Sequence, residues 1–242
     1  MPVTITAEPI RRDVVSYVRR GPRMNSSQAR AWETLRERYV VEPAHDERVT
    51  SVAADAAVDW DAEFGRRAPM GVEIGSGAGE TLAALALARP DENIVGFEVF
   101  APAAASTLSR LDRAGAGNVR LVVADGAQGL ATLFGPRCVS ELWTFFPDPW
   151  HKKRHHKRRL VGAEFASLAA SRLVVGGLWR LATDWADYAE WMRAVLDAEP
   201  GLANEYGGWA PRWDQRPVTR FERRGLDAGR TIYDLCYRAV GA

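Results

Sequence analysis

The sequence predicts an α/β protein built on a doubly wound, mostly parallel sheet, and three observations support this prediction. From residue 70 onward, short apolar segments alternate with helical patterns, as they do in a sheet covered by helices on both faces. A glycine-rich turn follows the first of these segments. Acidic residues stand at the ends of several of them. Ligands of such sheets bind beyond the carboxyl ends of the strands, so these turns and acids mark where a site is expected.

The apolar segments have the length of strands and are bounded by polar or turn-forming residues. We expect strands at 72–74, 94–97, 119–123, 142–146, 178–182 and 231–237. We expect helices after the first, second, fourth and fifth of these strands. An earlier helix, capped by Ser26 or Ser27, places Trp32, Leu35 and Tyr39 on one face, which indicates core packing.

Composition sets limits on the class of protein. The 242 residues are 47% hydrophobic and carry a net charge of only +1, which permits a sizeable core and shows no overall bias toward a polyanion. Two distant cysteines, Cys138 and Cys236, are typical of a reducing compartment. With no apolar leader and no segment long enough to span a membrane, we expect a soluble cytoplasmic protein. Residues 1–24 predict a flexible basic arm, and residues 25–242 a single domain.

The ends of the first three strands predict a cofactor site. Glu73 precedes a glycine turn containing Gly75 and Gly77, and glycine lets the backbone approach a ligand closely. Glu98 follows about twenty residues later, the spacing of a carboxylate that accepts hydrogen bonds from ribose hydroxyls. Asp125 ends the third strand, where it could accept a hydrogen bond from an adenine amino group. Any one of these acids alone is better explained as a helix cap or a turn residue, but together they indicate a nucleoside ligand.

The charge of the site favours S-adenosylmethionine over NAD. The glycine spacing is G-x-G-x-G rather than the G-x-G-x-x-G of dinucleotide enzymes. An acid-rich pocket would repel a diphosphate and attract a sulfonium ion that also carries an ammonium group. An NAD-dependent oxidoreductase remains the alternative for the glycine turn and Glu98 considered alone.

The densest positive segment of the chain directly follows Asp148 and covers residues 150–159. Its position beside the predicted site indicates that it neutralises nucleic-acid phosphates, and Trp150 suits either base stacking or core packing. His151 and His155 have the spacing of a metal pair on a helix. The surrounding cations would repel a metal ion, so we expect no metal site.

The residues from Phe146 to His155, followed by Lys157, Arg158 and Arg159, closely resemble the signature of the bacterial tRNA (guanine-N7-)-methyltransferase family. Segments 16–21, 72–75, 96–99 and 219–225 are similar to further motifs of that family, so the resemblance spans roughly residues 16–238. It implies the Rossmann-like fold of class I S-adenosylmethionine-dependent methyltransferases, with a seven-stranded sheet. Ser76 and Ala78 depart from the family pattern, in which bulkier residues are frequent, and this affects the packing around the methionine moiety.

The resemblance also implies roles for individual residues. Cofactor contacts fall on Glu73, Gly75, Gly77, Glu98, Asp125 and Asp148, and Asp148 is also the implied catalytic residue. The implied partner is tRNA, with a target guanosine in its variable loop. Contacts to tRNA or to this guanosine fall on Lys152, Arg154, His155, Lys157, Arg158, Arg159, Asp184, Thr219, Arg220, Phe221 and Glu222.

The chemistry of guanine N7 agrees with this set of residues. N7 has a free lone pair, so the enzyme needs to position it rather than deprotonate it. A carboxylate such as Asp148 would stabilise the positive charge that develops on the purine. Asp184 and Glu222 are candidates to read the base, although capping of the next helix explains Asp184 nearly as well. A noncatalytic tRNA-binding protein is a second alternative function, and the sequence is compatible with a monomer or a homodimer.

Overall fold

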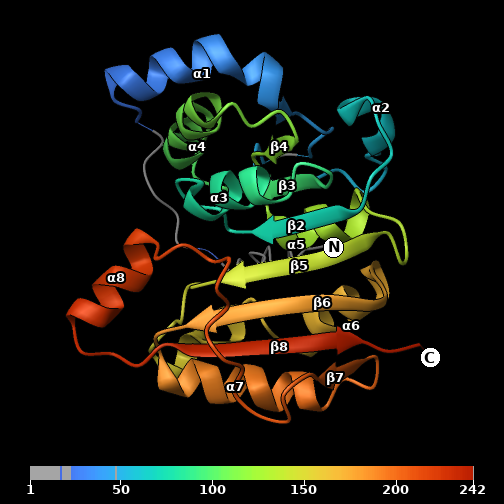
Figure 1. Cartoon of the computed structure of the whole chain (residues 1–242), viewed down its shortest axis with the longest axis vertical. Helices are drawn as coiled ribbons and strands as arrows, with labels where there is room; N and C mark the ends of the chain where they lie inside the picture. Colours follow the sequence, from blue (N-terminus) through green and yellow to red (C-terminus); the bar gives the residue numbers. More distant parts are fainter. Residues whose placement is uncertain (1–16, 18–22, 47, 242) are drawn as a thin grey trace, which may run out of the picture.

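The computed structural model describes residues 17, 23–46 and 48–241, and it contains one mixed sheet with helices on both faces (Figure 1). The eight strands follow the order β1-β4-β3-β2-β5-β6-β8-β7. Neighbouring strands are parallel from β1 through β6, and β8 runs antiparallel to both β6 and β7. The predicted α/β class and doubly wound topology are therefore confirmed.

The strands are β1 Val40–Val41, β2 Met70–Ile74, β3 Asn93–Phe97, β4 Val119–Val122, β5 Val139–Phe145, β6 Leu173–Thr183, β7 Leu202–Asn204 and β8 Tyr233–Ala239. The helices are α1 Ser26–Tyr39, α2 Trp60–Phe64, α3 Glu80–Ala88, α4 Ala101–Ala114, α5 Gly126–Thr132, the 3₁₀ helix η1 Lys153–Arg158, α6 Ala163–Arg172, α7 Ala186–Asp197 and α8 Arg220–Asp227. All six expected strands are present, although β6 begins five residues earlier than expected, and α2, α5, η1 and α8 were not among the expected helices.

The core forms two apolar layers, one on each face of the sheet. On one face, residues of α5, α6 and α7 pack against Val72 and Leu142. On the other face, residues of α1, α3 and α4 pack together with Trp143, and α1 lies along α4 (Figure 1). Leu142 and Trp143 are adjacent in β5 and face opposite layers, as the two-residue period of a strand requires. This arrangement leaves the carboxyl ends of the parallel strands open at one edge.

The order in which successive strands are added to the sheet reverses between β2 and β5: β3 and β4 lie on one side of β2, and β5 and β6 lie on the other. β2 pairs with β3 on one side and with β5 on the other, so the connections leaving β2 and β5 diverge. In doubly wound sheets such a switch point forms a crevice at the carboxyl ends of the strands, and ligands bind there. Gly75 follows β2 and Phe146 follows β5, so the glycine turn and the segment bearing Asp148 lie on the two sides of this crevice.

The sheet has eight strands in the described part of the chain, whereas the apolar segments predicted six and the family resemblance implied seven. The two-residue β1 and the three-residue β7 are too short to produce a periodic signal, and each is formed by pairing with a distant strand, β4 or β8. Helix α1 is confirmed with Tyr39 fully buried, but its N-cap is Asn25, which forms a capping box with Gln28. The predicted arm over residues 1–24 falls mostly outside the described residues. None of the described helices is long and apolar enough to cross a membrane.

Candidate cofactor and RNA site

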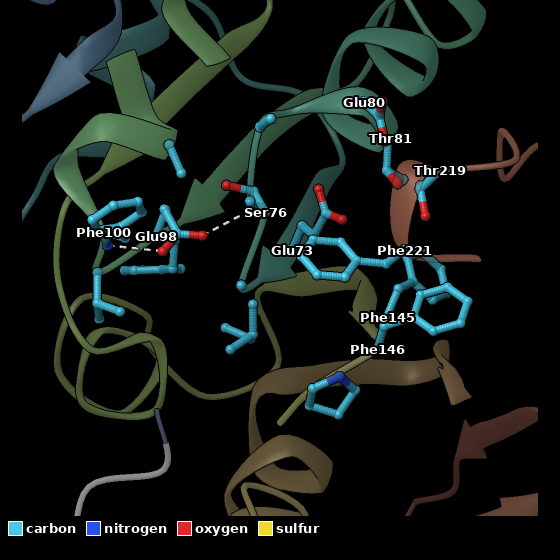
Figure 2. Close-up of a pocket in the computed structure, with 18 of the residues that line it drawn as sticks. Glu73, Ser76, Glu80, Thr81, Glu98, Phe100, Phe145, Phe146, Thr219 and Phe221 are labelled. Carbon is cyan, nitrogen blue, oxygen red and sulfur yellow. Dashed lines mark hydrogen bonds between the residues drawn. The ribbon is translucent and has the colours of Figure 1, made fainter. Parts of the chain in front are cut away.

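A cavity of about 540 Å³ opens at the switch point between β2 and β5. The glycine turn, the ends of β2, β3 and β5, the segment after β5 and the first turn of α8 line it. Figure 2 shows Glu98 and Phe100, which follow β3, on one side of this pocket, Glu73 of β2 near its centre, and the rings of Phe145, Phe146 and Phe221 on the other side. The residues predicted from the first, second and fourth strand ends therefore meet in one place.

The turn after β2 depends on its glycines. Gly75, Gly77 and Gly79 all have positive φ angles, of 80°, 57° and 73°. This left-handed region is easily accessible only to glycine. A side chain at Gly79 would also collide with Thr107 of α4. The turn brings the backbone N–H groups of Gly75 and Ser76 to the carbonyl of Phe97 at 2.9 Å each, so it is fixed against the end of β3.

Glu73 is the most unusual acid of the pocket. It is only 3% exposed, and its Oε2 atom is buried without a hydrogen-bond partner among the described residues. Burial and the nearby Glu98 raise the pKa of Glu73 to about 8, while a hydrogen bond from Thr81 opposes the shift. Ser76, also buried against the pocket, has an Oγ atom without a partner in the same described part of the chain. Such unsatisfied groups favour a ligand that carries a positive charge and hydrogen-bond donors, which is the chemistry of S-adenosylmethionine.

Glu98 and Asp125 both bind backbone N–H groups. Glu98 accepts a hydrogen bond from Gly77 at 2.8 Å through Oε2 and one from Phe100 at 2.8 Å through Oε1, so it joins the glycine turn to the end of β3 (Figure 2). Glu98 lines the pocket beside the glycine turn, the position predicted for a carboxylate that accepts hydrogen bonds from ribose hydroxyls. The Oδ1 atom of Asp125 caps α5 by accepting from Ala127 and Gln128. Burial raises the pKa of Asp125, and these two hydrogen bonds oppose the shift.

The segment bearing Asp148 has a strained backbone on both sides. Phe146 and Trp150 have φ angles of 52° and 47°, values that non-glycine residues rarely adopt. Between them, Pro147 and Pro149 restrict the backbone on either side of Asp148. The N–H of Phe146 donates to the carbonyl of Ala182 at 2.7 Å, which extends the β5–β6 pairing by one bond into the turn. Strain of this kind persists only where the surroundings hold it, and it concentrates at functional sites.

The predicted cationic segment forms η1 and is mostly exposed. Lys152, Arg154 and Lys157 face solvent, whereas His155 is half-buried against the edge of the Trp150 ring at 5.9 Å. Desolvation, together with the charge of Arg154 and the other cations of the segment, lowers the pKa of His155. The exposed cations follow Asp148 in the chain, between the pocket-lining residues Asp148 and Leu160.

Two arginines of this segment lie differently from the sequence expectation that they face RNA. The Arg158 guanidinium stacks over the Trp150 ring at 4.9 Å. Arg159 is buried, where it bonds to the Pro149 carbonyl at 3.1 Å, pairs with Asp187 and packs on Tyr188 of α7. Arg159 therefore fixes the Asp148 segment to α7 instead of presenting its charge to solvent. An arginine in a run of cations has no local signal for burial, so the sequence could not separate it from its neighbours.

Helix α8 covers the other side of the pocket. Thr219 caps it by accepting from the N–H of Glu222 at 3.2 Å, and the N–H of Arg220 donates to Glu80 of α3 at 2.7 Å. Phe221 reaches into the pocket, with its Cε2 atom 3.9 Å from where a Cβ on Gly77 would lie (Figure 2). These contacts place the start of α8 against the glycine turn.

The two acids considered as base-reading residues are already engaged. Asp184 is partly exposed and pairs with Arg230 at 2.7 Å, and it does not cap α7 through its side chain, because Trp185 is the N-cap residue. Glu222 is fully buried and bonds to Arg212 and Arg216. The two bonds lower the pKa of Glu222 against the opposing effect of burial. In this structure Glu222 holds α8 in place rather than facing the pocket.

Several pocket residues were not identified from the sequence as site residues. Tyr17 lines the pocket and bonds to Thr50 at 3.0 Å, while the carbonyl of Thr50 accepts the N–H of Asp125 at 2.7 Å. Phe145 and Phe146 contribute aromatic walls. Tyr17 and Phe146 lie in segments that resemble family motifs, but the sequence assigned no role to either residue. Phe145 has the pattern of an ordinary strand residue, and Tyr17 reaches the pocket only through tertiary packing.

Comparisons with known proteins agree with this geometry. A family model described as “Putative methyltransferase” matches residues 67–235. The structure is similar to that of a 16S rRNA (adenine(1408)-N(1))-methyltransferase variant from Catenulisporales acidiphilia, with a TM-score of 0.53 and 18% identity over 83% of this chain and 97% of that chain. It is also similar to the 16S rRNA methyltransferase KamB, with a TM-score of 0.53 and 16% identity over 83% of this chain and all of that chain. At these identities the likeness concerns the fold.

The fold, with its glycine turn and acidic pocket at the switch point, defines a class I S-adenosylmethionine-dependent methyltransferase. The chain is 56% identical to a tRNA (guanine-N(7)-)-methyltransferase of Cutibacterium acnes over 96% of its length and 85% of the relative's. It is 52% identical to one of a Nocardioides species, over 96% and 89%. The chain belongs to the tRNA (guanine-N7-)-methyltransferase family. Neither alternative function receives support from these similarities.

Proposed function

We propose that this enzyme transfers the methyl group of S-adenosylmethionine to N7 of a guanosine in the variable loop of tRNA, in the cytoplasm. The observation that carries the proposal is the position of Asp148. It lines the cofactor pocket and directly precedes the exposed cations of η1. A carboxylate at the site of transfer and a phosphate-binding surface beside it are the two features that N7 methylation of an RNA requires.

The cofactor, when bound, supplies an electrophilic methyl group. Glu73 presents a buried carboxylate oxygen to its positive charge, and Glu98, just after β3, is the carboxylate that we assign to its ribose hydroxyls. The glycine turn allows the backbone to approach the ligand closely. These residues belong to the rigid ends of β2 and β3, so they bind and orient the cofactor with little rearrangement.

The enzyme needs no general base, because N7 of guanine attacks through a free lone pair. Its task is to align N7 with the methyl group and to stabilise the positive charge that forms on the purine. Asp148 supplies a negative charge on a rigid, doubly proline-flanked turn. Phe221 and Phe146 add ring faces on which a displaced base can stack. We assign the target guanosine to the space between these rings and Asp148.

The direct test is methyl transfer from radiolabelled S-adenosylmethionine to unmodified tRNA transcripts. A transcript with guanosine in the variable loop should accept label at N7, and a matched transcript with adenosine at that position should not. Equal labelling of both transcripts would contradict the proposed target. Failure to label any tRNA by a protein that still binds the cofactor would contradict the proposed substrate.

The exposed cations of η1 should contribute through phosphates rather than through bases. Replacing Lys157 with alanine should weaken tRNA binding similarly for all tRNA sequences and reduce the slope of log K against log salt by about one. Filter binding between 50 and 200 mM salt measures this slope. Arg67→Ala is the matched control, because Arg67 is exposed just before β2, at the opposite edge of the sheet. A change of slope in the control equal to that of Lys157→Ala would exclude a local role for η1.

A further inference from the structure

Arg216 lies at the centre of a buried ionic cluster that joins helix α8 to the strand end bearing Asp148. Its side chain is 0% exposed, and its guanidinium bonds to two carboxylates in a bidentate manner. It donates to Glu222 at 3.3 and 3.2 Å, and to Asp234 at 3.2 Å and through a second, shorter bond. Arg212 adds a second bidentate pair to Glu222 from the partly exposed side. The two arginines and the two carboxylates have equal and opposite formal charge, so the cluster is not suited to bind a charged ligand.

One half of the cluster fixes α8. Glu222 belongs to the first turn of this helix, which also carries Thr219, Arg220 and Phe221 at the pocket wall. The Glu222 carboxylate accepts from both arginines, and its N–H is bound by the Thr219 cap. The orientation of the pocket-lining turn is therefore set by where the two arginines hold Glu222, and of the two only Arg216 also bonds to Asp234 among the described contacts.

The other half fixes the turn that precedes Asp148. Asp234 of β8 lies opposite Ala182 of β6 in the antiparallel pair, and the carbonyl of Ala182 accepts the N–H of Phe146. The Arg216 guanidinium carbon is also 5.6 Å from the centre of the Phe146 ring. Phe146 has a left-handed backbone conformation, and the Asp148 segment turns away from the sheet at this residue. Arg216 therefore supports this turn in two ways: it packs on the Phe146 ring, and it bonds to Asp234, which lies opposite the β6 residue that pairs with Phe146.

A buried ionic cluster is a poor way to gain stability, because desolvation of the charges offsets their attraction. Its planar, bidentate geometry instead restricts the distance and angle between the groups it joins. We propose that Arg216 is a positioning residue for methyl transfer. It fixes the position of α8 relative to the Asp148 turn, so that the target base is held next to the Asp148 carboxylate. Being wholly buried, it acts through Glu222, Asp234 and Phe146 and touches neither RNA nor cofactor.

The test compares Arg216→Lys with Arg238→Lys, which alters a bidentate arginine–carboxylate pair outside the cluster. Lysine keeps the charge but cannot bond to two carboxylates in the bidentate geometry of arginine. With cofactor and tRNA both saturating, Arg216→Lys should lower the single-turnover rate by roughly 10- to 100-fold, the scale of a small misplacement of reacting groups. Its dissociation constant for S-adenosylmethionine should stay within about threefold of the wild type, since Glu73 and Glu98 lie on other strands. Arg238→Lys should change the rate by less than about threefold, because the bidentate pair of Arg238 with Glu205 involves none of Glu222, Asp234 and Phe146 among the described contacts.

A double-mutant cycle separates positioning from a loss of folded protein. If Arg216 acts by placing Asp148, the effects of Arg216→Lys and Asp148→Glu on the rate should be non-additive, whereas independent effects multiply. A wild-type rate for Arg216→Lys, or multiplicative effects in the cycle, would overturn the inference. Should Arg216→Lys fail to fold, Asp234→Asn replaces it in the same cycle. The inference rests on the proposed function, and inactivity of the wild type toward tRNA would overturn that function separately.

Discussion

Replacing Asp148 with asparagine should lower the single-turnover rate of methyl transfer by at least about 100-fold, the effect of removing one preorganised electrostatic contact to a developing charge. Asparagine preserves the shape of the side chain and its hydrogen-bonding ability but removes the negative charge. The purine becomes cationic as the methyl group arrives, so this charge acts mainly in the transition state. The loss should therefore remain when tRNA and S-adenosylmethionine are both saturating.

The measurement uses radiolabelled S-adenosylmethionine with enzyme in excess over a guanosine-containing transcript. Asp214→Asn is the control, because Asp214 is an exposed acid in the segment before α8. It should transfer the methyl group at the wild-type rate. A rate for Asp148→Asn within about threefold of that control would exclude Asp148 as the catalytic carboxylate and would direct attention to other acids of the pocket.

Replacing Glu73 with glutamine should have two large effects of opposite sign. Affinity for S-adenosylmethionine should fall by at least about 30-fold, because the buried partner of a cationic ligand loses its charge. The ligand-free protein should become more stable at high pH, because glutamine does not ionise in the buried site. A residue that destabilises the free protein and strengthens ligand binding is the expected signature of a binding group.

The pH dependence follows from the direction of the shift. The pKa of Glu73 is about 8 in the folded chain, against an ordinary value of 4.5. Between these values the folded state holds a proton that the unfolded state has released, so the free energy of unfolding decreases as the pH rises. The contribution of the protonated Glu73 to the free energy of unfolding is fully present below pH 4.5 and is lost as the pH rises through 8, and its size is on the order of 5 kcal/mol.

Urea unfolding of wild type and Glu73→Gln at pH 5.5 and pH 9 checks this expectation in the absence of ligand. Relative to the wild type, the free energy of unfolding of Glu73→Gln should be larger at pH 9 than at pH 5.5. Calorimetric titration with S-adenosylmethionine at pH 8 measures the loss of affinity. Thr81→Val is a useful comparison, because it removes the hydroxyl that opposes the pKa shift and leaves the carboxylate in place. Equal pH dependence of wild type and Glu73→Gln would contradict the role of Glu73.

The part of the site built on successive parallel strands was predictable from the sequence. Glu73, Glu98 and Asp148 each stand at or just after a short apolar segment, and parallel strands bring their carboxyl ends to one edge. The glycine turn was also predictable from the sequence, because backbone positions with positive φ angles favour glycine. Asp125 shows the limit of the same reasoning, since its position at a strand end was correct while its carboxylate caps α5.

The sequence by itself determined the α/β class, the family and the acids Glu73, Glu98 and Asp148 that line the pocket, because all three depend on local periodicity and on motifs contiguous in the chain. Tertiary structure alone decided which charged residues of those motifs are buried. Arg159 and Glu222 lie within segments that the sequence predicts to contact RNA, yet both are buried. Arg159 pairs with Asp187 of α7, and Glu222 pairs with Arg212 and Arg216. Burial of a charge depends on the packing of whole elements around it, and no pattern of neighbouring residues encodes that packing.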